Sequence, residues 1–280
     1  MKSIFSAVAL IALMCILFAA PPAQAATKNV NCDEGQTIGH ALETAKGNAD
    51  RLEIFVTGTC NEQYINLRRD HVWITGQDGA LINGTVRVFG ANGIRFYDMA
   101  ISGSGNGLSV TGNSNVSAWN LVLVGNGGTS LIVRRGSAVM LADSQIIGTC
   151  ADIYDESCND GVNVDAATLE LRHTTISNSL HGIVAVAGAR VILNDRQGDN
   201  SKVFENSIAG IQVDLKSLVD LRGSSHIHDN RTGAMHILAG SHARIATPEV
   251  TVEGWIQCDD PLWSNLSNPH YLSVDTNCWW

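Results

Sequence analysis

The sequence has few charged residues, and the basic ones are outnumbered. Its 27 Asp and Glu residues exceed its 18 Lys and Arg residues, which gives a formal net charge of −9. Because a phosphate backbone requires a basic surface, we exclude nucleic acid as a partner. Charged residues form 16% of the chain and apolar residues 45%, with 27 glycines and only 5 prolines. This composition excludes a disordered chain, a coiled coil and collagen, and it supplies a sizeable core.

The first 25 residues have the pattern of a secretory signal. Lys2 precedes an apolar run over residues 4–20, and Ala23-Gln24-Ala25 supplies the small residues of a cleavage site. A retained membrane anchor is the alternative, but the run is slightly short for spanning a bilayer. We therefore expect a secreted or periplasmic protein whose soluble mature chain starts near Ala26, with no membrane insertion after cleavage.

The cysteines show no metal-site spacing, because no C-x-x-C motif occurs. Removal of the signal takes Cys15 away and leaves six cysteines in an exported chain, where disulfides are expected. Six cysteines allow 15 connectivities. Because the six fall into three pairs along the sequence, the simplest pairing joins Cys32 with Cys60, Cys150 with Cys158, and Cys258 with Cys278.

A repeat runs through the middle of the chain. In most copies a glycine precedes alternating apolar positions, as in Gly161-Val162-Asn163-Val164. The steps between copies are 23, 31, 21, 28 and 24 residues, and the equivalent apolar residues are Leu108, Leu131, Val162, Ile183, Ile211 and Met235. The two longest steps carry insertions, the loop between Cys150 and Cys158 and the polar stretch 194–200. A base period of this length indicates a solenoid.

Each repeat supplies two or three short strands separated by Gly, Asn, Asp and Ser turns. A second alternating segment follows the first by about ten residues, for example Leu169-Glu170-Leu171 and Val191-Ile192-Leu193. One repeat cannot bury its inward residues alone, whereas stacked repeats bury them in one continuous column. We therefore predict an all-β parallel β-helix rather than a β-sandwich or jelly roll, which needs hairpin turns.

These repeats resemble the right-handed parallel β-helix superfamily with its pectin lyase-like fold, which includes pectate lyases and polygalacturonases. The resemblance covers most of the mature chain and implies a right-handed solenoid that begins with a short capping helix. Asp160-Gly161 and His181-Gly182 look similar to the Asp-containing and His-Gly motifs of polygalacturonases. The Arg-Ile-Lys motif of those enzymes is missing, since Arg244-Ile245-Ala246 has no lysine. Nothing matches the catalytic motifs of pectate lyases, so the resemblance implies the architecture and leaves the reaction open.

Both ends of the column are expected to be capped. Apolar residues at positions 38, 41, 42 and 45 form the stripe of a short amphipathic helix that would close the first coil. From about residue 248 the chain holds four of its six tryptophans. We expect one β-helix domain over residues 26–247, including the N-terminal cap, and a disulfide-closed C-terminal cap over 248–280. A platform for stacking sugars is the alternative role for these tryptophans.

Side chains alternate across a strand and stacked strands lie about 4.8 Å apart, so equivalent outward residues form columns along the solenoid. We expect Asp165 beside Arg134, Asp160 beside His181, and Asp214 two rungs, or about 10 Å, from Asp165. The first column contains Ser109, Ile132, Asn163, Val184, Gln212 and His236; the second contains Thr111, Arg134, Asp165, Val186, Asp214 and Leu238; the third contains Asn106, Asp160, His181, Ala209 and Thr232. These polar residues gather beside the 150–158 loop, where a binding site is expected.

The columns hold candidate catalytic residues for two carbohydrate reactions. Inverting hydrolysis uses two carboxyl groups about 6.5 to 9.5 Å apart, for which Asp165 and Asp214 are candidates. A lyase acting on uronates needs a base and a cation that neutralises the carboxylate, and Arg134 is the candidate cation. Asp160 beside His181 would tune a general acid. The structural alternatives are an Arg134–Asp165 salt bridge and an Asp and His that only solvate a turn.

We expect the partner to be an extended, uronate-containing polysaccharide, with Asn163, Gln212, His236 and Tyr154 as its binding residues. The alternative is a non-catalytic surface-interaction module, favoured by the missing catalytic motifs and by apolar outward residues such as Val184. No cofactor is expected. Calcium is the alternative on that point, because one stretch supplies four acidic side chains with oxygen ligands: Asp152, Asp155, Glu156 and Asp160.

Overall fold

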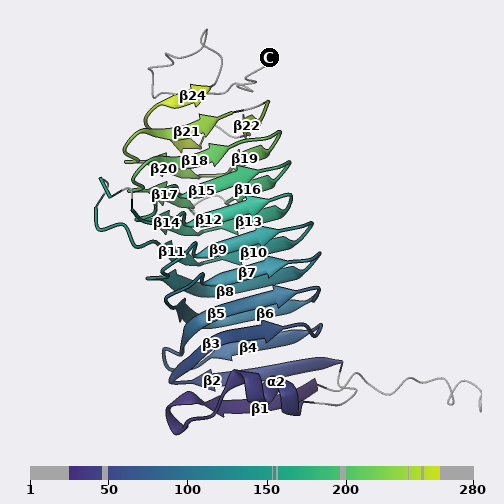
Figure 1. Ribbon diagram of the computed structural model, residues 1–280. Coiled ribbons are helices and arrows are strands. Elements are labelled where there is room, and N and C mark those ends of the chain that lie inside the picture. Colours follow the sequence, from purple (N-terminus) through teal and green to yellow (C-terminus); the bar gives the residue numbers. More distant parts are fainter. Residues whose placement is uncertain are drawn as a thin grey trace, which may run out of the picture.

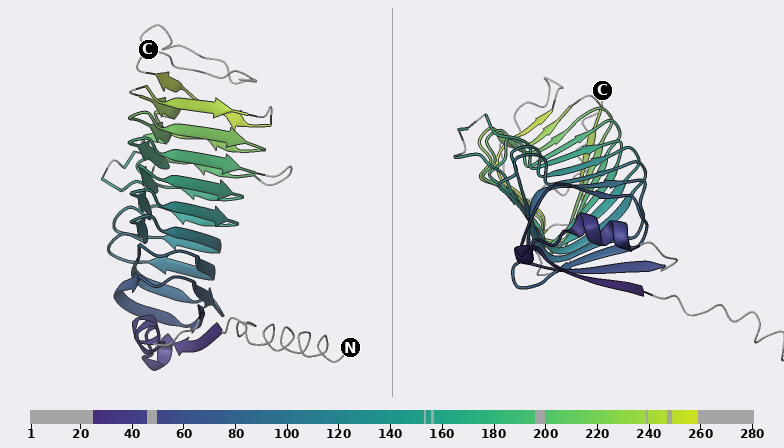
Figure 2. Two further views of the ribbon diagram at one scale, coloured as in Figure 1. Left: turned by 90° about the vertical axis from the view of Figure 1, so that its right-hand side faces the viewer. Right: turned by 60° about the horizontal axis from the view of Figure 1, so that its bottom comes forward.

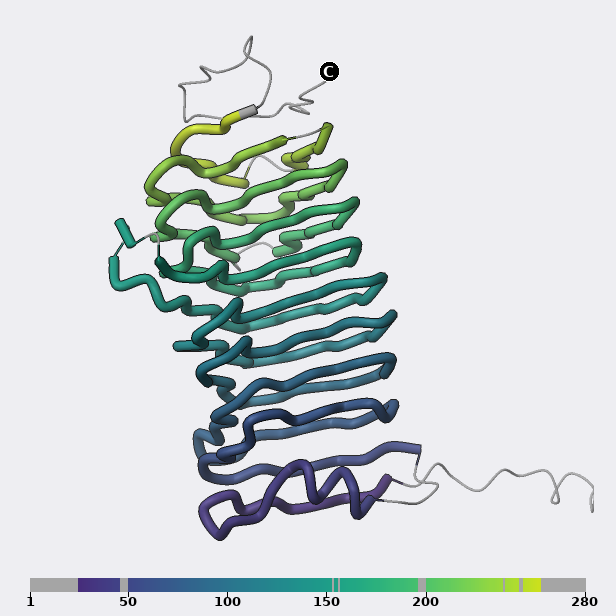
Figure 3. The backbone as a smooth tube through the Cα atoms, in the orientation of Figure 1, coloured from purple at the N-terminus to yellow at the C-terminus, as the bar shows by residue number. Residues whose placement is uncertain are grey.

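The computed structural model describes residues 25–45, 50–152, 154–155, 157–195, 200–238, 240–246 and 249–258. Over these residues the chain winds as a right-handed parallel β-helix, which confirms the fold expected from the repeat (Figure 1). Each coil passes through three sheets in turn, and its strands pair in parallel with those of the next coil (Figure 3). Viewed from the end, the coils surround a common interior (Figure 2).

We number the sheets in the order in which the chain enters them. Sheet 1 contains β1 (Ala25–Asn31), β2 (Arg51–Thr57), β4 (Val72–Gly76), the first part of β6 (Ile94–Ser102) and of β8 (Asn115–Val124), β10 (Ala138–Ala142), β13 (Thr168–Arg172), β16 (Arg190–Asn194), β19 (Leu218–Arg222) and β22 (His242–Ile245). Sheet 2 contains the first part of β3 (Thr59–Leu67) and of β5 (Leu81–Phe89), the second part of β6 and β8, β11 (Gln145–Ile147), β14 (Thr175–Ser177), β17 (Lys202–Phe204), β20 (His226–His228) and β23 (Thr251–Val252). Sheet 3 contains the second part of β3 and β5, β7 (Leu108–Thr111), β9 (Leu131–Arg134), β12 (Val162–Asp165), β15 (Ile183–Val186), β18 (Ala209–Val213), β21 (Gly233–Ile237) and β24 (Ile256–Cys258).

The interior is a stack of apolar side chains, with one level per coil. In sheet 3 the register joins, in order, the six residues that the repeat makes equivalent, and each is 0% exposed: Leu108, Leu131, Val162, Ile183, Ile211 and Met235. Each coil thus covers the apolar side chains of its neighbour. Strands this short gain their stability from the stack rather than from their own length.

The helix α2 (Ile38–Thr44) covers the N-terminal end of the column (Figure 1). It confirms the amphipathic capping helix predicted from the apolar stripe, because Ile38 and Ala41 are both buried. It follows the short 3-10 helix η1 (Cys32–Glu34). Glu62 of β3 holds the start of α2, because its two carboxylate oxygens accept hydrogen bonds from the backbone N–H groups of Ile38 (2.6 Å) and Gly39 (2.9 Å). Such a carboxylate satisfies backbone donors that the first turn leaves free.

The chain bends from sheet 1 to sheet 2 through a residue in the left-handed conformation. In four successive coils this residue is Asp98, Asn120, Asp143 and His173, with φ values of 53°, 51°, 50° and 46°. Asn and Asp adopt this conformation more readily than most residues. Their side chains also join neighbouring coils, since Asn120 Nδ2 donates to Asp98 Oδ1 at 2.8 Å and His173 Nδ1 lies 2.8 Å from Asp143 Oδ1.

In the next coil, Asp195 occupies the same corner, and its carboxylate is buried, only 7% exposed. It accepts hydrogen bonds from the backbone N–H groups of His173 (2.8 Å) and Ser201 (2.9 Å). The hydroxyl groups of Ser201 and Ser225 donate to it at 2.7 Å and 2.8 Å. Asp195 therefore joins three consecutive coils.

We expect Asp195→Ala to lower the free energy of unfolding by about 3 kcal/mol, because buried donors lose a charged acceptor. Urea unfolding of the full chain measures the loss. Asp195→Asn keeps one acceptor oxygen and should fall between Asp195→Ala and the wild type. Glu43→Ala, on the exposed side of α2, is a surface control expected to stay within about 0.5 kcal/mol. Equal stabilities for Asp195→Ala and Glu43→Ala would contradict the prediction.

Two of the three predicted disulfides are present, Cys32–Cys60 and Cys150–Cys158, with Cα–Cα distances of 4.9 Å and 5.1 Å. Cys258 is the last residue of β24, and its predicted partner Cys278 lies outside the described residues. The predicted signal over 1–25 and the predicted cap over 248–280 also fall largely outside them. In the described part of the chain, no helix has the length and apolar character needed to cross a membrane.

The register corrects one position of the third predicted column. Ala209 pairs with Gly233 rather than with Thr232, whose N–H and hydroxyl both donate to the carbonyl oxygen of Ile208. The glycine misleads here, because Gly233 stands two residues before the inward Met235, whereas Gly210 directly precedes Ile211. The inward apolar residue is thus the safer marker of register.

Candidate functional site

The outer face of sheet 3 carries the two long columns of side chains that the repeat predicts. We use this name for the surface formed by the outward residues of β3, β5, β7, β9, β12, β15, β18 and β21. Pairing extends the first column toward the N-terminus, so that it runs Asn66, Arg87, Ser109, Ile132, Asn163, Val184, Gln212 and His236. In the second column Phe89 pairs with Thr111, and Asp165 pairs with Arg134 and Val186.

Arg134 of β9 lies against two residues of β12. Its Nε is 3.9 Å from Asp165 Oδ2, and its Nη2 donates to Asn163 Oδ1 at 3.3 Å. The side chains of Arg134 and Asp165 are 46% and 41% exposed, so this ion pair stabilises the fold by at most about 1 kcal/mol. The guanidinium consequently remains open to a carboxylate of a bound ligand.

Asp160 and His181 form a closer and better shielded pair at the other side of the face. His181 Nδ1 lies 2.9 Å from Asp160 Oδ1, and the two side chains are 15% and 24% exposed, respectively. Among the described residues, none forms a hydrogen bond with the second ring nitrogen, His181 Nε2. A carboxylate bonded to Nδ1 orients the imidazole and fixes its tautomer, which is the arrangement used by histidine bases.

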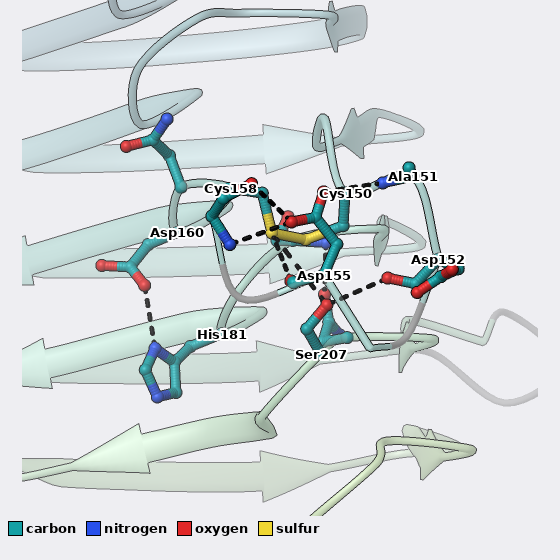
Figure 4. The surroundings of a disulfide bond; sticks show 12 residues. Cys150, Ala151, Asp152, Asp155, Cys158, Asp160, His181 and Ser207 are labelled. Carbon is teal, nitrogen blue, oxygen red and sulfur yellow. Dashed lines mark hydrogen bonds and ion pairs between the residues drawn. A yellow bond between two sulfur atoms is a disulfide. The ribbon is translucent and has the colours of Figure 1, made fainter.

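The Cys150–Cys158 loop lies beside this pair (Figure 4). Asp155 organises the loop by accepting hydrogen bonds from the N–H groups of Ala151 (3.1 Å) and Ser157 (2.9 Å). The Ser157 hydroxyl and the same two N–H groups lower the pKa of the Asp155 carboxyl. Ser207, which directly precedes Ile208 near β18, donates its hydroxyl to the carbonyl oxygen of Asp152 at 3.2 Å. The loop is therefore fixed both to itself and to a later coil.

The structure does not bring the Asp160–His181 pair together with Arg134 and Asp165. Asp160 precedes β12 and Asp165 ends it, so five residues, or up to about 16 Å, separate the two positions along the strand. The predicted cluster is thus two groups that border the outer face of sheet 3 on opposite sides. A ligand bound on this face would therefore contact Arg134 and His181 through two different parts of the ligand.

His236 lies in the first column, and burial lowers the pKa of its imidazole, with a further lowering by nearby His181. Its Nε2 is buried and has no hydrogen-bond partner among the described residues. Gln212 pairs directly with His236 in the register. The two predicted binding residues are therefore adjacent, on the same side of the molecule as His181.

The lowered pKa of His236 predicts a loss of stability on acidification. The folded protein binds fewer protons than the unfolded chain near the ordinary histidine value of 6.5, so stability is highest above that pH and falls below it. We expect His236→Gln to reduce the fall in melting temperature between neutral and mildly acidic pH. His226, whose pKa is lowered chiefly by burial, keeps part of the dependence in that variant. Identical pH profiles for His236→Gln and the wild type would refute the assignment.

Two predicted positions, Asp214 and Tyr154, stand apart from these groups. Asp214 follows β18, and its Oδ1 accepts a hydrogen bond from the N–H of Leu215 at 2.6 Å, so the carboxylate caps its own turn. Tyr154 of the loop is 69% exposed, with the guanidinium of Arg231 5.0 Å from its ring centroid. Val184, in the first column, is only 8% exposed and offers little free apolar surface.

In the acidic stretch considered for calcium, each described Asp has at least one carboxylate oxygen in a local contact. Asp152 Oδ1 accepts from the Tyr154 N–H at 2.7 Å, Asp155 binds the N–H groups described above, and Asp160 contacts His181. Within the ranges that the structure describes, no group of three or more His, Cys, Asp or Glu side chains is placed to hold a metal ion. Glu156 lies outside those ranges, and calcium stays the untested alternative to the expectation of no cofactor.

Sequence reasoning missed the N-terminal part of the outer face of sheet 3. Tyr64 and Phe89 are 45% and 49% exposed there, with the guanidinium of Arg87 3.8 Å from the Tyr64 ring centroid. The signal was available, because Ile65 and Val86 precede Leu108 at the same period. A second aromatic group lies on sheet 1, where Tyr97 stacks on Trp119 at 5.0 Å, but arginines cover the neighbouring Trp73.

Comparison with known proteins supports the architecture. No protein-family model and no curated protein sequence matches the chain. Among solved structures, the chain is similar to the A-module of mannuronan C-5 epimerase AlgE4 from Azotobacter vinelandii, with a TM-score of 0.54 and 12% sequence identity. The match covers 81% of this chain and 82% of that one. At this identity the similarity shows the shared parallel β-helix fold.

Proposed function

We propose that this protein binds an extended, uronate-containing polysaccharide along the outer face of sheet 3 and removes a proton next to a uronate carboxylate. The observation that carries the proposal is the Asp160–His181 pair, 2.9 Å apart and partly shielded, at the edge of a face with arginine side chains. The similar solved structure, named as acting on mannuronan, supports a polymeric acidic substrate on such a solenoid.

His181 has the better placement for the reacting base than the aspartates of the second column. Asp165 is paired with Arg134, Asp214 caps the Leu215 N–H, and their positions are two rungs apart, about 10 Å. Inverting hydrolysis uses two carboxyl groups, and both of these are already engaged in local contacts. Proton removal needs one oriented base, so it does not require a second reacting carboxyl group at a fixed distance.

Arg134 takes a binding role in this proposal. Because it lies on the opposite side of the face from His181, its guanidinium would hold the carboxylate of a different sugar unit from the one that reacts. Removal of the C5 proton transfers it to the imidazole. The resulting carbanion either takes a proton from water on the opposite face of the sugar, which is epimerisation, or forms a C4=C5 double bond as the C4–O bond breaks and its oxygen leaves, which is elimination.

The test is incubation of the purified protein with polymannuronate, polygalacturonate and a neutral glucan in D₂O. We expect deuterium at C5, or unsaturated products, from a uronate polymer alone. New reducing ends without unsaturation would instead indicate hydrolysis and overturn the proton-removal chemistry. Binding of a uronate polymer without any turnover would favour the non-catalytic alternative, and absence of both binding and turnover would defeat the proposal entirely.

A further inference from the structure

A hollow of about 160 Å³ lies at the N-terminal end of the outer face of sheet 3. It spans β3, β5 and β7, the strands that precede the predicted site residues in the same columns. The side chains that matter for its chemistry are Asn66, Arg68, Arg87, Phe89, Ser109 and Thr111. The hollow is therefore a separate depression on the face already described, not part of the Asp160–His181 group.

The two arginines of the hollow are held by aromatic rings rather than by acids. The guanidinium of Arg87 lies 3.8 Å from the centroid of Tyr64, and that of Arg68 lies 5.8 Å from the centroid of Phe89. No described Asp or Glu forms an ion pair with either of them. Arg172, on sheet 1, is different because it is paired with Glu170 at 2.7 Å. In a chain with a net charge of −9, two such arginines at one depression present positive charge that attracts an anion.

The rest of the lining points to a sugar as the carrier of that anion. The Phe89 ring is about half exposed and offers an apolar surface to the face of a pyranose ring. Asn66, Ser109 and Thr111 add an amide and two hydroxyl groups, which donate to and accept from sugar hydroxyls. A carboxylate, an apolar ring face and several hydroxyls together describe a uronate residue.

We propose that this hollow is an anchoring subsite that holds the carboxylate of one uronate residue between Arg68 and Arg87, while the polymer runs along the columns toward His181. The inference rests on the proposed function, because it assigns the same polymer to the same face. Arg87 and Val184, on the rung of His181, are four register steps apart, or about 19 Å. One sugar ring cannot bridge that distance, so only an oligomer of several units engages both places.

The experiment measures binding of size-fractionated oligomannuronates and oligogalacturonates by calorimetry, for the wild type, Arg68→Gln and Arg87→Gln. We expect each substitution to weaken long oligomers about tenfold, which corresponds to the loss of one charged hydrogen bond. The same loss should appear in KM, with kcat unchanged. Arg172→Gln is the matched control and should bind like the wild type. Thermal unfolding checks that each variant is folded.

The outcomes separate this inference from the proposed function. If the hollow variants bind oligouronates as tightly as the wild type while turnover persists, the subsite is refuted and the function stands. If they lose binding but the wild type shows no turnover, the subsite stands and the chemistry fails. Equal affinity of the wild type for a neutral oligoglucan refutes carboxylate recognition. Failure of the wild type to bind any oligouronate refutes both.

Discussion

Replacement of His181 with asparagine is expected to reduce turnover of a uronate polymer by about 100- to 10,000-fold, the usual contribution of a general base. Asparagine can keep a hydrogen bond to Asp160, because its side-chain amide reaches the position of the imidazole Nδ1. It has no group that accepts a proton near neutral pH. Initial rates by deuterium incorporation or by formation of unsaturated products measure the change.

The matched control is His173→Asn on another corner of the solenoid. His173 also contacts an aspartate through Nδ1, at 2.8 Å from Asp143, but both side chains are 53% exposed and lie between sheets 1 and 2. Asparagine suits the left-handed backbone at this position, where φ is 46°. We expect His173→Asn to keep the wild-type rate. Similar rates for His181→Asn and His173→Asn would remove His181 from the chemistry, whereas binding without turnover in the wild type and in both variants would point to a non-catalytic module.

Phe96→Ala is expected to lower the free energy of unfolding by about 3 to 5 kcal/mol. Phe96 is 0% exposed, and the register places it between Ile74 of β4 and Ala118 of β8 in the interior stack. Removal of the ring leaves a cavity that neighbouring coils cannot fill, because their own backbones are fixed by parallel pairing. Urea unfolding followed by circular dichroism measures the loss.

Phe89→Ala is the matched control for this prediction. Phe89 is the same residue type at the end of β5, the strand directly before β6 in the chain, but it is 49% exposed on the outer face of sheet 3. We expect its removal to cost less than about 1 kcal/mol. If the two phenylalanine variants were equally stable, the interior stack would not be the main source of stability in these coils.

The sequence was sufficient to predict the fold because the β-helix is encoded locally and repeatedly. Six apolar residues from Leu108 to Met235 keep one phase, and the structure pairs them in that order. The same phase placed Arg134 beside Asp165 and Asp160 beside His181. Contacts between neighbouring coils follow directly from register, so they are accessible without coordinates.

The remainder of the site depends on information that register does not contain. A column gives the spacing of two residues along the axis, but it does not give the direction or the contacts of their side chains. Asp214 illustrates this limit, because its carboxylate accepts a hydrogen bond from the Leu215 N–H, a contact that the column does not predict. The hollow at Arg68 and Arg87 was missed for a different reason, since the repeat was followed only from Leu108 onward.

Because successive coils pair with one another in the same parallel way, the coils are interchangeable units of equal height. Strands in the described part join only neighbouring coils, and the step from Val162 to Ile183 is a 21-residue coil without an insertion. Tandem duplication of that segment would lengthen the solenoid by one coil, about 4.8 Å. The new coil would make the same kinds of contact with its neighbours as the existing coils do. Evolution can thus match such a protein to longer partners by copying DNA, without inventing a new core.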